Sequence, residues 1–253
     1  MKLLMMGHLL GDFYFQTNKV AEKKKKSFAY TVWHCVVYSL VMFAVLTITT
    51  GKLVECILPS LLIGVLHLLV DGVKCGVHKC VKLDKYELSI FIVDQMIHFG
   101  ILFVVRCLYT IEYNIDWVPG ISENLLFSMQ KVPVILCAFL LCGKPAAIIV
   151  SLVFGLIPKT IEKANFDSVK IIDGSSKENV RIGSWIGILE REIILILGLL
   201  GQYGAIGFVI AAKSLARHSQ LNEPAFAEKY LIGTLLSTFM ALLCIMMCKC
   251  NSV

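Results

Sequence analysis

Long apolar stretches are the feature that most constrains this chain. Residues 28–50, 53–73 and 87–109 are each about as long as the roughly 20 residues that a helix needs to cross a membrane. A spanning segment must satisfy its own backbone hydrogen bonds, which leaves helices or a closed barrel. Runs of this length indicate helices. The sequence therefore predicts an all-α, polytopic membrane helix bundle.

The composition supports this class. Of the 253 residues, 57% are apolar and only 17% are charged. Soluble domains usually have about 45–50% apolar residues with glycine counted, and about a quarter charged. This balance excludes a disordered chain, a collagen-like fibre and an ordinary water-soluble enzyme. The net charge of +6 is better explained by basic loops beside anionic lipid than by nucleic-acid binding.

The apolar stretches predict about seven or eight membrane segments, some of them short or re-entrant. The remaining stretches are 3–15, 125–142, 145–158, 183–200, 203–216 and 230–248. Gly143-Lys144-Pro145 interrupts residues 125–158, so this part is either one kinked span or contains a re-entrant piece. We expect an N-terminal membrane domain at 1–110, connecting segments at 111–158, and a polar loop with a glycine-rich membrane domain at 159–253.

The loop charges predict an orientation. Lysine and arginine concentrate in loops 17–27, 74–86 and 159–182, whereas loop 110–124 has neither. Basic loops face the cytoplasm in most membrane proteins. The first three loops are therefore expected in the cytoplasm and 110–124 on the other side, in a multi-pass protein of the inner, or cytoplasmic, membrane.

Three histidine–aspartate pairs stand in these apolar surroundings, each with a spacing of four residues. They are His8 with Asp12, His67 with Asp71, and Asp94 with His98. In an α-helix this spacing places two side chains about 40° apart and about 6 Å along the axis, on one face. A lone aspartate at the centre of a membrane helix costs roughly 2.5–3.5 kcal/mol. We therefore expect these side chains to face one another, water or a cation.

Imidazole and carboxylate groups together suit Zn²⁺, Mn²⁺ or Fe²⁺. His34 adds a seventh candidate ligand, and so many ligands would suit two ions about 3.5–4 Å apart. Such a pair of metals suits phosphoester hydrolysis, with Asp12, Asp71 or Asp94 as a catalytic carboxylate and Lys74 holding the phosphate. Gln16 and Gln95 are candidates for orienting ligands or substrate.

The C-terminal half offers a second polar set. Its members are Glu190, Arg191, Lys213 and Arg217. Ion pairs between helices and a binding site for an anionic group both remain open as explanations. The glycines from 183 to 207 suit close helix packing in lipid, including a homo-oligomer. Cys75, His78 and Cys80 are a weak candidate for a zinc site, because no second cluster of zinc-binding residues accompanies them.

Several motifs together resemble a known family. They are His8-x-x-x-Asp12-Phe13-x-x-Gln16, then Ala21 and Lys24, His67-x-x-x-Asp71-x-x-Lys74, Asp94-Gln95-x-x-His98, Gly187-x-Leu-Glu190-Arg191, Ala212-Lys213-Ser214-x-Ala216-Arg217, and Glu228-x-Tyr230-x-Ile232-Gly233-Thr234. In this order they resemble the bacterial membrane family catalogued as domain of unknown function 3307. Lys229 departs from the pattern, because such proteins often read Glu-Tyr directly. The resemblance implies a bacterial inner-membrane protein but supplies no reaction.

We therefore expect a membrane-embedded, metal-dependent hydrolase acting on a phosphorylated lipid or another amphipathic phosphoester. Two alternatives remain open. The same residues would line a cation or proton pathway in a transporter or channel. In a non-enzymatic signalling or assembly protein, the basic loop 159–182 would instead receive a partner.

Overall fold

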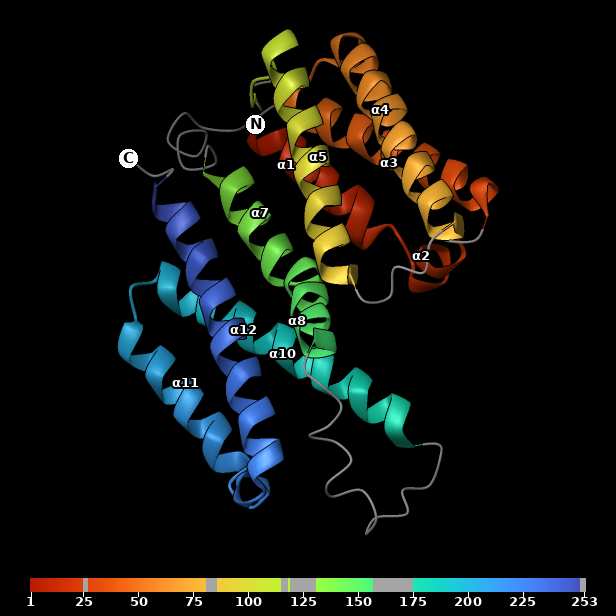
Figure 1. Ribbon diagram of the computed structural model, residues 1–253. Coiled ribbons are helices and arrows are strands. Elements are labelled where there is room, and N and C mark those ends of the chain that lie inside the picture. The colour runs from red at the N-terminus through yellow and green to blue at the C-terminus, as the bar shows by residue number, and fades with distance from the viewer. Residues whose placement is uncertain (25–26, 81–85, 115–117, 119–130, 157–174, 251–253) are drawn as a thin grey trace. The chain divides into compact units, whose positions relative to one another are not determined.

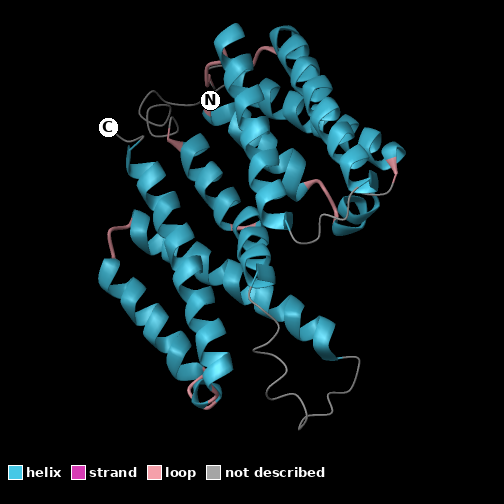
Figure 2. Ribbon diagram, viewed as in Figure 1, coloured by secondary structure: helices cyan, strands magenta, loops and turns pink. Residues whose placement is uncertain are grey.

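The computed structural model describes residues 1–24, 27–80, 86–114, 118, 131–156 and 175–250. Within these residues every regular element is a helix and none is a strand (Figure 2). The predicted all-α membrane fold is therefore confirmed. Loop 159–182 lies outside the described residues up to 174, and so do residues 81–85 and most of 115–130.

Among the residues that the structure describes, five helices are long and apolar enough to cross a membrane. They are α3 (Phe28–Thr50), α4 (Leu53–Cys80), α5 (Glu87–Leu108), the consecutive α7 (Val132–Cys142) and α8 (Lys144–Leu156), and α12 (Pro224–Cys250). Their outward faces are apolar: Leu40, Val54 and Phe103, for example, are each more than half exposed. The chain is thus a multi-pass membrane protein.

The predicted seven or eight segments exceed these five. Residues 3–15 form only the short helix α1 (Lys2–Leu9) and the π-helix η1 (Leu10–Tyr14). Residues 183–200 belong to α10 (Ser175–Leu199), which carries charges within its apolar run, and α11 (Tyr203–Ala216) has only 14 residues. Across 132–156 the break at Gly143 leaves one interrupted apolar stretch of 25 residues.

The described chain divides into two compact units, Met1–Leu140 and Leu141–Val253. The first contains α1, η1, α2 (Asn18–Lys24), α3, α4 and α5 together with most of α7. The second contains α8, α10, α11, the short 3-10 helix η4 (Gln220–Asn222) and α12.

In the first unit α3 and α4 form an antiparallel hairpin (Figure 1). Gly51 makes the tight connection possible, because its φ of 70° lies in the left-handed region that glycine adopts without strain. The two helices approach closely at Gly64, where an added Cβ would lie 1.9 Å from Ser39 Oγ. This close packing fixes the register of the two helices that carry His34 and His67.

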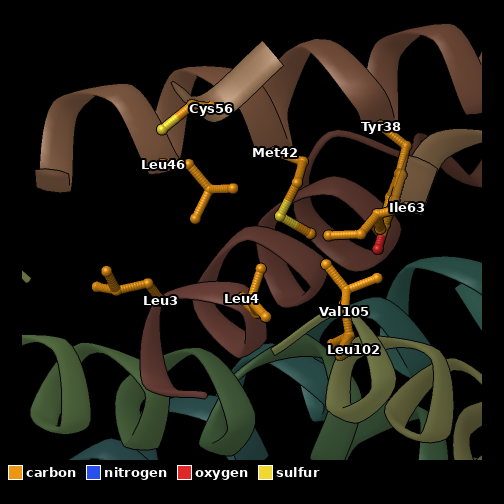
Figure 3. Close-up of a cluster of buried hydrophobic side chains, with 9 residues drawn as sticks. All are labelled: Leu3, Leu4, Tyr38, Met42, Leu46, Cys56, Ile63, Leu102 and Val105. Carbon is orange, nitrogen blue, oxygen red and sulfur yellow. The ribbon is translucent and has the colours of Figure 1, made fainter. Parts of the chain in front are cut away.

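A buried apolar cluster holds α1, α3, α4 and α5 together (Figure 3). Its members include Leu4, Met42, Leu46, Ile63 and Leu102, each at most 1% exposed. Burying such a side chain stabilises the fold by roughly 1.5–3 kcal/mol where the alternative is water. In a membrane the gain comes from close packing instead. This cluster thereby sets the positions of the helix faces that bear the polar residues.

Candidate metal centre

The three histidine–aspartate pairs and His34 all lie inside the first unit, on buried faces of η1, α1, α3, α4 and α5. His8, His34, His67 and Asp71 are at most 3% exposed, and Asp12 is 9% exposed. On α3 the buried face bears Thr31, His34, Cys35, Tyr38 and Met42. These helices therefore have the polarity of a membrane bundle, with lipid-facing apolar residues outside and polar groups inside.

Four possible ligand atoms come together from three elements. They are Asp12 Oδ1 from η1, His34 Nε2 from α3, and His67 Nε2 and Asp71 Oδ2 from α4. His34 Nε2 lies 3.2 Å from Asp12 Oδ1, 3.3 Å from His67 Nε2 and 3.8 Å from Asp71 Oδ2. His67 Nε2 lies 3.6 Å from Asp71 Oδ2 and 4.0 Å from Asp12 Oδ1.

These separations resemble those between the ligands of a tetrahedral metal ion. Bonds of about 2.0–2.2 Å to nitrogen and oxygen place neighbouring ligand atoms about 3.3–3.6 Å apart in a tetrahedron. The five measured separations range from 3.2 to 4.0 Å. Asp12, His34 and His67 thus form a group that could hold an ion such as Zn²⁺, and Asp71 Oδ2 lies within 3.8 Å of both histidine nitrogens.

Asp71 also belongs to a second group. Ligand atoms of Asp71, Asp94 and His98 lie within 4.8 Å of one another, and so do those of Cys35, His67 and Asp71. Asp94 Oδ1 is 3.7 Å from His98 Nε2, which is too long for a direct hydrogen bond. Asp71 is therefore shared by two groups that could hold a metal, one with Cys35 and His67 and one with Asp94 and His98.

Two histidine nitrogens in this cluster are buried and lack a hydrogen-bond partner among the described residues. They are His67 Nδ1 and His98 Nε2. A buried polar atom without a partner costs about 1–3 kcal/mol, so such atoms are rare in folded proteins. The nitrogen of His98 faces the carboxylates of the second group. A metal ion bound by these carboxylates would give this nitrogen a partner.

His8 has a different position from the one that its spacing to Asp12 predicts. Its Nδ1 lies 3.1 Å from the hydroxyl of Tyr38, and its Nε2 lies 3.2 Å from Gln95 Oε1. The amide nitrogen of Gln95 in turn donates to Asp12, at 3.3 Å, and to Asp94, at 3.4 Å. His8 therefore lies beside these groups and is connected to Asp12 and Asp94 through Gln95.

The reason is the local helix type. The expectation of one shared face assumes α-helical rotation between residues 8 and 12, but the chain is π-helical from Leu10 to Tyr14. A π turn contains more residues than an α turn, so it rotates the side chains that follow it. Asp12 consequently points to His34 rather than to His8.

Comparison with known proteins gives one finding for this part of the chain. The model of a family described as a protein of unknown function, DUF3307, matches residues 1–127. The chain belongs to this family. Neither the curated proteins nor the solved structures contain a match. The matched range includes all seven candidate ligands, whereas the motifs that resemble the family in the C-terminal half lie beyond it.

Two lysines complete the site of this DUF3307 protein. Lys74 Nζ donates to Asp94 Oδ2 at 2.7 Å, so the predicted phosphate-binding lysine here pairs with a carboxylate. Lys24 Nζ lies 2.9 Å from Asp71 Oδ2, 3.0 Å from Gln16 Oε1 and 4.0 Å from Asp12 Oδ1. Burial alone would lower the pKa of Lys24, but the carboxylates of Asp12 and Asp71 hold this pKa above its usual value.

The sequence patterns missed Lys24, Tyr38 and Cys35 as members of the site. In the sequence Lys24 appears as one charge of a basic loop and as part of the family motif, without a role in the site. The ring of Tyr38 stacks on His67 with centroids 3.9 Å apart, and His98 lies 4.3 Å away from the same imidazole. Their positions in the sequence could have indicated Tyr38 and Cys35. Tyr38 follows His34 by four residues and Cys35 by one, so all three lie on one side of an apolar helix.

The polar residues predicted as a second set in the C-terminal half of the DUF3307 chain each have separate partners. Lys213 pairs with Glu190 at 2.5 Å, as the ion-pair explanation expects. Arg191 is buried and donates to the carbonyls of Cys142 and Gly143, where α7 ends. Arg217 contacts Gln220 at the surface. Each group thus has its own partner, and the side chains of His78 and Cys80 lie outside the described residues.

Proposed function

We propose that the first unit holds two divalent transition-metal ions that share Asp71. Asp12, His34, His67 and Asp71 would bind one ion, and Asp71, Asp94 and His98 would bind the other. The main support is the near-tetrahedral spacing of the first four ligand atoms, from 3.2 to 4.0 Å. A carboxylate that bridges two ions is a common feature of two-metal hydrolytic sites.

The proposed reaction is hydrolysis of a phosphoester in a phosphorylated lipid or another amphipathic molecule. The oxygen of water would bond to phosphorus, the ester P–O bond would break, and the released alcohol would take a proton. Metal ions supply charge stabilisation and lower the pKa of a bound water in such sites. Asp94 is the candidate general base through its Oδ2, because Asp94 Oδ1 lies on the side of His98 whereas Oδ2 lies on the side of Lys74, the more exposed of the two lysines.

The surroundings favour an amphipathic substrate. The ligands come from helices whose opposite faces are exposed and apolar, as at Leu69 and Met96. A substrate with an acyl chain would place that chain in lipid and its phosphate near the polar interior. Because loops 17–27 and 74–86 are basic, we assign the phosphate side of the site to the cytoplasmic face.

Hydrolysis of phosphatidic acid tests this function directly. The full chain would be placed in lipid nanodiscs, loaded with Zn²⁺ or Mn²⁺, and assayed for release of inorganic phosphate. We expect release by the wild-type protein and a loss of at least a hundredfold in His67→Ala. His218→Ala, which changes an exposed histidine of the second unit, is the matched control. Metal-loaded protein that cleaves neither this lipid nor a soluble aryl phosphate would contradict the proposal.

One observation favours a second candidate, a proton or cation pathway. Hydrogen bonds connect Tyr38, His8, Gln95 and Asp12, and continue from Asp12 to His34 and His67. Such chains of ionisable groups occur in pumps and transporters. Proton flux into liposomes that disappears in both Asp12→Asn and Asp94→Asn, with no phosphate release by the wild-type protein, would favour this alternative.

A further inference from the structure

Lys24 and Lys74 are the most open charged groups of the metal centre. Their side chains are 14% and 26% exposed, whereas the carboxylates of Asp12, Asp71 and Asp94 are 9%, 2% and 8% exposed. Lys24 ends α2, which is not one of the five membrane-spanning helices. A ligand that approaches the carboxylates from outside would therefore meet these ammonium groups early.

Both lysines contact the carboxylates that the proposed metals would occupy. Lys24 pairs with Asp71 and lies near Asp12, and Lys74 pairs with Asp94. A divalent ion between these carboxylates would neutralise them more strongly than an ammonium group does. The lysines would then be free to turn toward another anion at the same place, because each has a flexible four-carbon stem.

The charge balance indicates which anion fits. Three carboxylates face two divalent cations and two ammonium groups, so the loaded site would carry three excess positive charges. Buried charge of one sign is unfavourable unless a counter-ion binds. A phosphate monoester carries about two negative charges near neutral pH and exposes three free oxygens. A phosphate diester carries one negative charge and exposes two.

We infer that Lys24 and Lys74 together bind the free oxygens of a doubly charged phosphate monoester at the metal centre. This inference rests on the proposed two-metal function and specifies its substrate class. Lys24 is the new element, because it has no place in the reaction as expected from the sequence. Either a lipid headgroup or a soluble molecule can present this monoester.

Binding of inorganic phosphate to the metal-loaded full chain tests the role of the lysines. An ammonium–phosphate contact is a charged hydrogen bond, so we expect Lys24→Gln and Lys74→Gln each to weaken phosphate binding about tenfold to a hundredfold. Lys24→Arg should stay within a few-fold of wild type. Lys19→Gln, on the exposed side of the same helix α2, should bind as wild type does. Equal phosphate affinity in wild type, Lys24→Gln and Lys74→Gln would overturn the inference.

A second measurement uses only the wild-type protein, so it tests the inference even if Lys24→Gln does not fold. Inorganic phosphate bound to wild-type protein would be displaced with methyl phosphate and with dimethyl phosphate. We expect at least a tenfold preference for the monoester, and equal displacement would overturn the inference. Nanodiscs with phosphatidic acid or with phosphatidylglycerol identify the source. Displacement by phosphatidic acid alone supports a lipid monoester, displacement by methyl phosphate alone supports a soluble one, and displacement by phosphatidylglycerol as strong as by phosphatidic acid contradicts both.

Elemental analysis of the same samples separates this inference from the proposed function. If the wild-type protein contains no transition metal, the two-metal function fails and the inference falls with it. If metal is present but the lysine variants bind phosphate normally, only the lysine assignment is overturned.

Discussion

At the scale of single residues, Asp71 has the most demanding position in the molecule. It is 3% exposed, pairs with Lys24, and belongs to more than one group of possible metal ligands. A buried carboxylate is stable only with such partners. We assign Asp71 the role of binding both proposed ions, whereas His98 would bind one ion only.

This difference predicts unequal effects of two substitutions. Asp71→Asn keeps the side-chain volume but removes the charge, and we expect it to weaken binding of both ions at least tenfold. His98→Ala should weaken one ion only and leave the other near its wild-type affinity. Titration of metal-depleted protein with Zn²⁺ against a chelator of known affinity measures both constants. Equal behaviour of the two variants would contradict a shared carboxylate.

Lys24 gives a second prediction at this scale. Without metal, its ammonium is the close cationic partner of Asp71, at 2.9 Å. Breaking a buried ion pair from one side destabilises a protein by about 3–5 kcal/mol. Lys24→Gln should therefore lower the thermal stability of the metal-free protein strongly, and that of the metal-loaded protein much less.

Lys52→Gln is the control, because it removes an exposed pair with Glu55 of about the same length, 2.9 Å. Exposed pairs contribute about 0–1 kcal/mol. Thermal unfolding in detergent with and without Zn²⁺ provides the comparison. An equal loss in Lys24→Gln under both conditions would show that the metal does not take over the role of the lysine.

At the scale of helices, the spacing of His34 and His67 depends on how closely α3 and α4 approach. An added Cβ at Gly64 would lie 2.9 Å from Ser39 Cβ and closer still to its hydroxyl oxygen. At Gly76, in the same helix, an added Cβ meets no described atom within 4 Å. The two glycines thus differ in whether a described side chain lies against them.

We therefore expect Gly64→Ala to cost about 1–3 kcal/mol, as overpacking usually does. It should also reduce metal affinity, because it moves His67 relative to His34. Gly76→Ala should be neutral or slightly stabilising, since alanine favours a helix more than glycine does. Thermal unfolding and Zn²⁺ titration of both variants test this. Wild-type metal binding by Gly64→Ala would contradict the assigned packing.

The helices also show which parts of the fold and the candidate site can be predicted from the sequence. Apolar length predicts α3, α4 and α5, and the four-residue spacing predicts that their histidines and aspartates are buried together. The contact of Asp12 with His34 was not predictable, because the π turn at Leu10–Tyr14 has no clear sequence signal. Lys24 was missed for another reason: its partner Asp71 is 47 residues away, and spacing along one helix carries no information about such contacts.

At the scale of the whole molecule, the candidate centre lies within one of the two compact units. All seven predicted ligands fall in Met1–Leu140, and the family match covers 1–127. In Leu141–Val253, Glu190 and Lys213 pair with each other, and Arg191 donates to backbone carbonyls of the same unit. The chemistry that we propose therefore belongs to the family-defining part of the chain.

The orientation of this unit is a prediction on the same scale. Helix α5 lies between the basic loop 74–86 and the acidic residues after Leu108. We expect alkaline phosphatase fused after Lys79 to be inactive and the same enzyme fused after Asn114 to be active. Green fluorescent protein at the two positions should give the opposite pattern and serves as the control. Equal activity at both positions would mean that α5 does not cross the membrane.

The central claim is that metal ions bring these buried imidazoles and carboxylates together. Elemental analysis of the full chain, purified without chelator, tests it most directly. We expect about two equivalents of transition metal per chain in the wild type and a clear reduction in the double variant His34→Ala, His67→Ala. Folded wild-type protein with no stoichiometric transition metal, and with no uptake of added Zn²⁺, Mn²⁺ or Fe²⁺, would contradict it.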